Sequence, residues 1–95
     1  MKIIIIKVKL RANWVHSLKE KRMVVKSLVK KLQNKFNISV SEVDNQDIHQ
    51  SIVIGIAGIC LDSRQADSTI DNIINYIYEN TDAEIINIDT TIDVY

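Results

Sequence analysis

The sequence predicts an α+β sandwich in the element order βαββαβ, with a four-stranded antiparallel sheet that carries two helices on one face. Two observations predict this class. Segments near both ends of the chain alternate apolar and polar side chains, as half-buried strands do. Two interior segments repeat apolar residues at helical spacing. With 95 residues the chain has room for one core, so residues 1–95 are expected to form a single domain.

The first strand is expected over residues 2–11. Its core-facing set is Ile4, Ile6, Val8 and Leu10. A helix follows over residues 18–35, opened by a capping box in which Ser17 binds a backbone N–H and Glu20 reaches back. The apolar stripe of this helix comprises Leu18, Val25, Leu28, Val29, Leu32 and Phe36.

The second half of the chain continues the same order. Its expected elements are a short strand at 38–43, an Asx-rich turn at 44–47, a long strand at 48–61, a helix capped by Asp62 or Ser63 and ended by 80–82, and a strand at 84–95. Two right-handed βαβ crossovers in one sheet give the ferredoxin-like split arrangement, with the first and third strands in the middle.

Charge is divided sharply along the chain. Eleven of the twelve basic residues lie in the first 36 positions, where Glu20 is the one acid. The other eleven acids and Arg64 follow from residue 37 onward. The division indicates either a basic surface for an anionic partner or two halves that neutralise each other in the fold.

A row of four cations on the first helix is the leading candidate for a binding surface. It consists of Lys19, Arg22, Lys26 and Lys30, spaced three, four and four residues apart. Such a row can follow a phosphate backbone. The alternative is a solvated helix face. A second row on the first strand, Lys7, Lys9 and Arg11, is expected to be neutralised by Asp89 and Asp93 of the last strand.

Trp14 and His16 precede the first helix, at its electropositive N-terminus. Trp14 is a candidate for stacking on a base. The favoured alternative is that Trp14 plugs the end of the core, because its apolar area is large. His16 is expected to form local hydrogen bonds.

The outer face of the sheet is expected to expose an apolar patch. The patch consists of Ile3, Ile5, Val53 and Ala57, with Ile59 beside them. A contiguous exposed patch usually marks an interface, and we expect a homodimer to cover it. The alternative is an ordinary sheet face covered by long neighbouring side chains. Aromatic residues are absent from the first and third strands, so bases are not expected to stack on the sheet.

Acid and histidine side chains form the only set with metal-binding or acid/base chemistry: Glu42, Asp44, Asp47, His49 and His16. Positions 42 and 44 are expected on one strand face. The spacing matches no recognised ligand pattern, so no metal, cofactor or catalytic residue is expected. The lone Cys60 favours a reducing cytoplasm, and no apolar run is long enough for a membrane span.

Two segments, His16 to Arg22 and Ser41 to Asp47, resemble the YlxP-like family of small bacterial proteins. The resemblance implies a ferredoxin-like fold. The molecular function of the family is unassigned. Its genes often lie among translation and ribosome-maturation genes, so the resemblance favours ribosomal RNA as a partner. The resemblance supplies no catalytic residue.

Three functions are therefore open. The leading hypothesis is a cytoplasmic binding protein for structured RNA or the ribosome, which uses the basic first helix. The second is a protein-interaction or assembly module that uses the apolar outer sheet face. The third is a small-molecule or metal-dependent enzyme.

Overall fold

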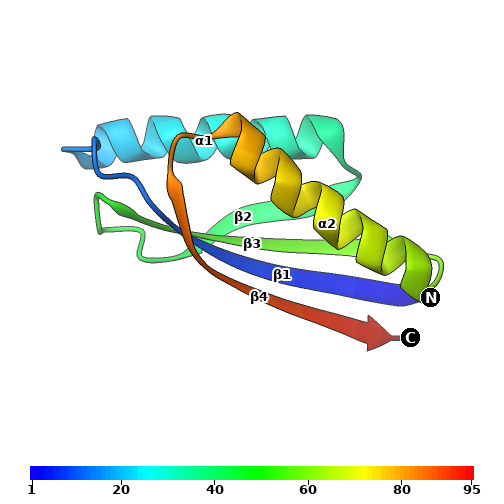
Figure 1. The fold of residues 1–95 in the computed structure, drawn as a ribbon. Coiled ribbons are helices and arrows are strands. Elements are labelled where there is room, and N and C mark those ends of the chain that lie inside the picture. Colours follow the sequence, from blue (N-terminus) through cyan, green and yellow to red (C-terminus); the bar gives the residue numbers. More distant parts are fainter.

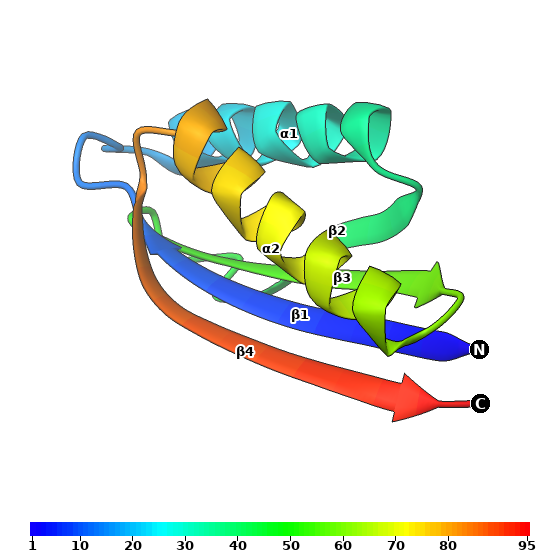
Figure 2. The same cartoon turned by 45° about the vertical axis from the view of Figure 1, so that its right-hand side comes forward.

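The computed structural model describes residues 1–95. Its elements are β1 (Lys2–Arg11), α1 (Leu18–Lys35), β2 (Ile38–Asp44), β3 (Ser51–Cys60), α2 (Ser63–Asn80) and β4 (Glu84–Val94). The four strands form one antiparallel sheet in the order β2-β3-β1-β4. Both helices lie on the same face of this curved sheet (Figure 1; Figure 2). The expected ferredoxin-like βαββαβ sandwich is confirmed.

The core fills the space between the helices and the inner face of the sheet. β1 and β3 contribute alternate residues, and the helices contribute their apolar stripes. Core residues from β1, β3 and the two helices include Ile4, Ile6, Val8, Leu10, Ile52, Ile54, Ile56, Leu28, Leu32, Ile70, Ile73 and Ile77. This alternation confirms the predicted faces of β1 and β3, because every second residue of a strand points to the same side.

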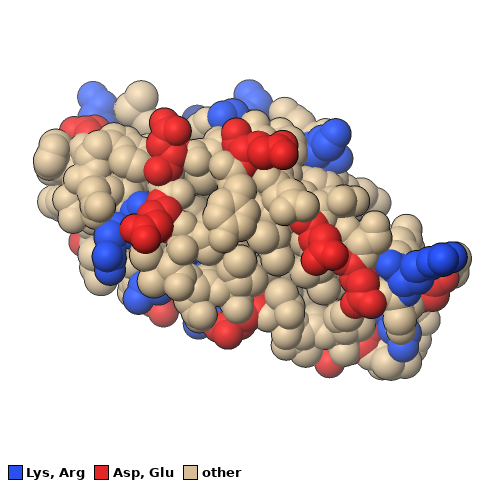
Figure 3. Space-filling model, viewed as in Figure 1, with Lys and Arg blue, Asp and Glu red and all other residues tan.

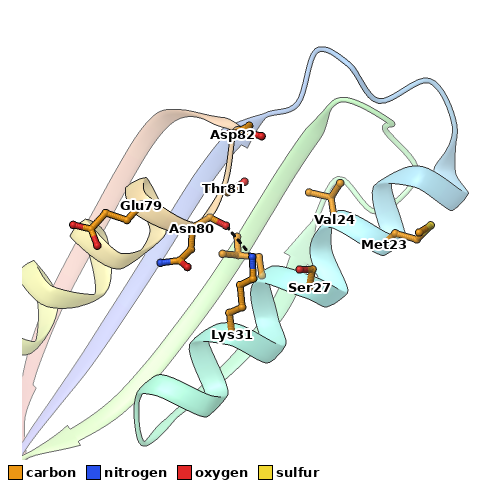
Figure 4. A pocket seen from close by; sticks show the side chains of 9 residues that line it. Met23, Val24, Ser27, Lys31, Glu79, Asn80, Thr81 and Asp82 are labelled. Carbon is orange, nitrogen blue, oxygen red and sulfur yellow. Dashed lines mark hydrogen bonds between the residues drawn. The ribbon is translucent and has the colours of Figure 1, made fainter.

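Side chains cap both helices at their ends. The Ser17 hydroxyl accepts the N–H of Glu20 at 3.1 Å, and the Asp62 carboxylate accepts the N–H of Gln65 at 2.9 Å. At the other end of α2, the Nζ of Lys31 donates to the carbonyl oxygen of Asn80 at 3.4 Å (Figure 4). Lysine at this position also favours the negative end of the helix dipole.

The β2–β3 connection is longer than predicted. β3 begins at Ser51, whereas the sequence predicted residue 48. Asn45 adopts φ 55°, in the left-handed region that asparagine tolerates, and its carbonyl oxygen accepts the N–H of Ile48 at 3.0 Å. Residues 48–50 therefore belong to the turn, although Ile48 is apolar.

Both edge strands contain an irregularity at the same level of the sheet. β2 shifts register between Glu42 and Asp44, and the β1–β4 pairing shifts between Lys9 and Leu10. Asp44 and Lys9 both pair with Val53 of β3. Because a bulge inserts one residue, it moves the following side chain to the other face.

The bulge in β2 overturns one expectation. Glu42 pairs with the core residue Ile54, so it faces the helices. Asp44 pairs with Val53 and lines a depression with Lys7 and Lys9 on the outer face. The prediction that positions 42 and 44 share one strand face is therefore wrong.

Candidate nucleic-acid interface

The four cations predicted to form a binding row lie along one exposed side of α1. They are Lys19, Arg22, Lys26 and Lys30. At about 100° per residue they fall within an arc of roughly 80°, away from the buried residue Leu28. The row rises about 16 Å along the helix at 1.5 Å per residue. None of these cations forms an ion pair, since the one ion pair of the structure joins Lys21 to Glu42.

The exposed sides of the two helices carry opposite charges. Figure 3 shows acidic side chains along the diagonal course of α2 and basic side chains along the upper edge, where α1 runs. α2 contains Asp67, Asp71 and Glu79 against the single base Arg64. No ion pair joins the two helices. The basic row on α1 is therefore not neutralised by direct contact with the acidic half of the chain.

Some of the basic residues of β1 lie opposite acids in the strand pairing. Lys7 lies directly opposite Asp89 in the β1–β4 pairing. Asp93 instead lies opposite Ile3, and Lys9 lies opposite Asn87. Lys7 and Asp89 are neighbours in the strand pairing but form no ion pair, and Asp93 is placed beside an apolar residue, so neutralisation of this row by Asp89 and Asp93 stays a prediction.

Trp14 does not plug the core. Its side chain is 44% exposed, whereas Ala12 and Val15 of the same loop are fully buried and close that end of the core. Gln50 holds the loop in place, because its Nε2 donates to the carbonyl oxygens of Asn13 and Val15 at 3.1 and 3.2 Å. The favoured expectation for Trp14 is thus wrong, and its ring remains accessible at the N-terminal end of α1. His16 is also exposed.

A buried ion pair lies beneath the first turns of α1. Lys21 is only 1% exposed, and its Nζ lies 2.9 Å from Oε2 of Glu42 and donates to the carbonyl oxygen of Asn45. A buried ammonium group needs such partners, because removing it from water is costly. The pair connects the two segments that carry the family resemblance.

Sequence reasoning missed Lys21. It precedes Val25 by four residues and Leu28 by seven, so it falls on the apolar stripe of α1. A lysine within that apolar stripe, together with a glutamate on the neighbouring edge strand, is the sequence signal that indicates a buried ion pair.

The other acid/base residues do not gather around Glu42. Asp44, Asp47, His49 and His16 are exposed. No three His, Cys, Asp or Glu side chains lie close enough together to hold a metal ion. Cys60 is buried at the end of β3.

A depression of about 500 Å³ lies between α1 and the C-terminal end of α2. Lys31 reaches across it to Asn80, whereas the carboxylate of Glu79 points away from Lys31 (Figure 4). The Glu79 carboxylate therefore does not join Lys31 and Asn80 in one polar cluster.

The apolar residues of the outer sheet face have unequal exposure. Ile5 is 43% exposed and Ile59 is 71% exposed, while Ala57 is exposed and Ile3 half-buried. Val53 is only 3% exposed. The predicted exposure of Val53 is wrong, because Lys9 and Asp44 flank its side chain on the two neighbouring strands. The exposed part of the patch consists of Ile5, Ala57 and Ile59, with the half-buried Ile3 beside them.

Neither helix has a stretch that is long and apolar enough to cross a bilayer.

The fold and these surfaces define a small ferredoxin-like α+β protein whose two helices carry opposite exposed charges. The chain belongs to the family described as "Protein of unknown function (DUF503)", whose model matches residues 3–90. It is 39% identical over 61 residues to "Uncharacterized protein YlxP" of Bacillus subtilis (strain 168). This alignment spans 64% of the chain and 66% of that relative. The predicted YlxP-like resemblance is confirmed.

A solved structure with a similar fold is "De novo designed protein Foldit4". The similarity has a TM-score of 0.55 at 9% identity and covers 98% of both chains. At this identity the likeness concerns the fold alone.

Proposed function

We propose that this protein is a binding protein, without a catalytic residue, that contacts structured RNA or the ribosomal surface through the basic row of α1. The observation that carries the proposal is the row itself, in which four exposed cations have no ion-pair partner in the chain. Unpaired cations in a line suit a phosphate backbone, where each contact releases counterions. Such contacts position the protein on RNA and do not read sequence.

We expect the variant Lys26→Gln/Lys30→Gln to bind structured ribosomal RNA about tenfold more weakly at low salt, because two phosphate contacts are lost. The matched control is Lys7→Gln/Lys35→Gln, which removes the same charge from exposed positions outside the row. The measurement is a titration of labelled RNA. An equal loss of affinity in the two variants would show that net charge, and not the row on α1, governs binding.

Trp14 is the proposed stacking residue of this interface, because its ring is exposed beside the N-terminal end of the row. If it stacks on an unpaired base, Trp14→Ala should weaken RNA binding by roughly 1–3 kcal/mol. The slope of log affinity against log salt should not change, since no charge is removed. Unchanged affinity would remove Trp14 from the interface.

The second candidate function is protein interaction through the outer sheet face, with a homodimer as the expected assembly. It is favoured by the exposure of Ile5 and Ile59. Self-pairing along the edge of β4 is disfavoured, because that strand carries Glu84, Asp89 and Asp93 and no base.

If two copies cover this face, Ile5→Lys/Ile59→Lys should give monomers with unchanged helix and strand content. Val53 is not a suitable position for this test, because it is buried within one chain. The measurement is light scattering across a concentration series, with circular dichroism to verify folding. An unmodified chain that stays monomeric at high concentration would exclude the homodimer.

A further inference from the structure

Another depression, distinct from the two described above, lies at the loop end of the outer sheet face, away from the α1 row. It has a volume of about 440 Å³, within the range of small-ligand sites. Its lining comes from β1, the β2–β3 turn, β3 and β4, and includes Lys9, Arg11, Ile48, Gln50, Ser51 and Ile86. Neither the sequence nor the proposed RNA interface accounts for this site.

A bulge in β4 forms one wall of the depression. Lys9 pairs with Asn87 and Leu10 pairs with Ile85, so Ile86 is the extra residue of the bulge. Bulges of this kind re-aim side chains and occur often beside functional sites. Ile86 is 40% exposed and Ile48, on the opposing turn, is 51% exposed.

The turn that carries Ile48 is held from several sides. The Nζ of Lys21 donates to the carbonyl oxygen of Asn45, which also accepts the N–H of Ile48 at 3.0 Å. The carbonyl oxygen of Gln50 accepts the N–H of Ala12 at 2.9 Å. These contacts fix the wall of the depression before a ligand arrives, which lowers the entropy cost of binding.

The lining has a defined chemistry. It contains the two cations Lys9 and Arg11 and no carboxylate. Glu84 lies opposite Arg11 in the strand pairing but forms no ion pair with it. The Nε2 of Gln50 donates to two loop carbonyl oxygens, so the Oε1 of Gln50 remains available as an acceptor.

Ser51 completes this set of polar groups. Its hydroxyl oxygen accepts a hydrogen from Asn45 Nδ2 at 3.0 Å, so the hydroxyl hydrogen can be donated to a ligand.

We propose that this depression binds one nucleotide, with its phosphate on Lys9 and Arg11 and its base against Ile48 and Ile86. Arginine suits phosphate because its planar donors match two oxygens at once. The flat apolar face of a base suits exposed branched aliphatic side chains. Gln50 Oε1 and Ser51 Oγ offer an acceptor and a donor to the base edge. The nucleotide is either a free mononucleotide or one unit of an RNA strand, since both present this chemistry.

The test is an NMR titration that follows the methyl groups of Ile48 and Ile86. The probes are adenosine and uridine monophosphate, a short single-stranded RNA, inorganic phosphate and an acidic peptide. We expect the methyl signals to shift with a mononucleotide, with the RNA or with both, and the responding probe identifies the source of the ligand. Lys9→Gln/Arg11→Gln should weaken this binding at least tenfold.

The charge-matched control is Arg22→Gln/Lys30→Gln on α1, which should leave mononucleotide affinity unchanged. This control also separates the site from the proposed RNA interface, because structured RNA should lose affinity in the control variant even if the depression binds nothing. No methyl shift with either nucleotide probe at low salt would overturn the proposal. An equal response to inorganic phosphate, or a response to the acidic peptide alone, would overturn it as well.

Discussion

Replacement of Leu28 by aspartate is expected to unfold the protein at room temperature. Leu28 is 3% exposed in the centre of the α1 stripe, so the variant places an unpaired carboxylate in the core. The expected cost is several kcal/mol, a large share of the stability of so small a domain. The measurement is thermal unfolding followed by circular dichroism.

The matched control is Lys26→Asp, two residues away on the exposed side of α1. It introduces the same side chain in water and should leave the melting temperature within a few degrees of the unmodified chain, because surface changes are usually small. Similar melting temperatures for the two variants would contradict the register of α1, and with it the position of the basic row.

Removal of Glu42 is expected to have the second largest effect. In Glu42→Leu the ammonium group of Lys21 stays buried and keeps only the carbonyl oxygen of Asn45 as a partner. Removing one partner of a buried pair costs about 3–5 kcal/mol. We expect the denaturation midpoint in urea to fall accordingly.

The double variant Lys21→Met/Glu42→Leu should recover most of this stability. Replacement of a buried ion pair by apolar side chains of similar size is often neutral or stabilising. The Asn45 carbonyl oxygen keeps the N–H of Ile48 as a donor, so it is not left unpaired. A double variant as unstable as Glu42→Leu would show that Lys21 and Glu42 are not energetically coupled.

Local patterns in the sequence predict most of the fold. Period-two alternation predicts β1 and β4, and Ser17 places the start of α1 as observed. Of the two candidate caps of α2, Asp62 and Ser63, the structure selects Asp62. The sequence predicts a start of β3 at residue 48, three residues before the observed Ser51, because Ile48 continues an apolar run. The left-handed backbone of Asn45 closes a longer turn there, and hydrophobicity alone carries no information on that conformation.

Less of the surface could be predicted. The exposed cations of α1 follow from helical spacing, but the burial of Lys21 and Val53 does not follow from strand or helix periodicity. Both depend on which strands become neighbours and on where the bulges fall. The bulge in β2 also moves Asp44 to the other face of the sheet from Glu42. The bulge in β4 forms the depression around Ile86. These are tertiary features, because register between strands is set by pairing across the sheet.

The salt dependence of RNA binding tests the proposed interface most directly. The two proteins to compare are the unmodified chain and the variant in which Lys19, Arg22, Lys26 and Lys30 are all replaced by glutamine. We predict that log affinity for structured ribosomal RNA falls linearly with log salt, and that the slope of the variant is shallower by about four units, one for each lost phosphate contact. Parallel lines for the two proteins, or no binding even at low salt, would contradict the account and favour interaction through the outer sheet face.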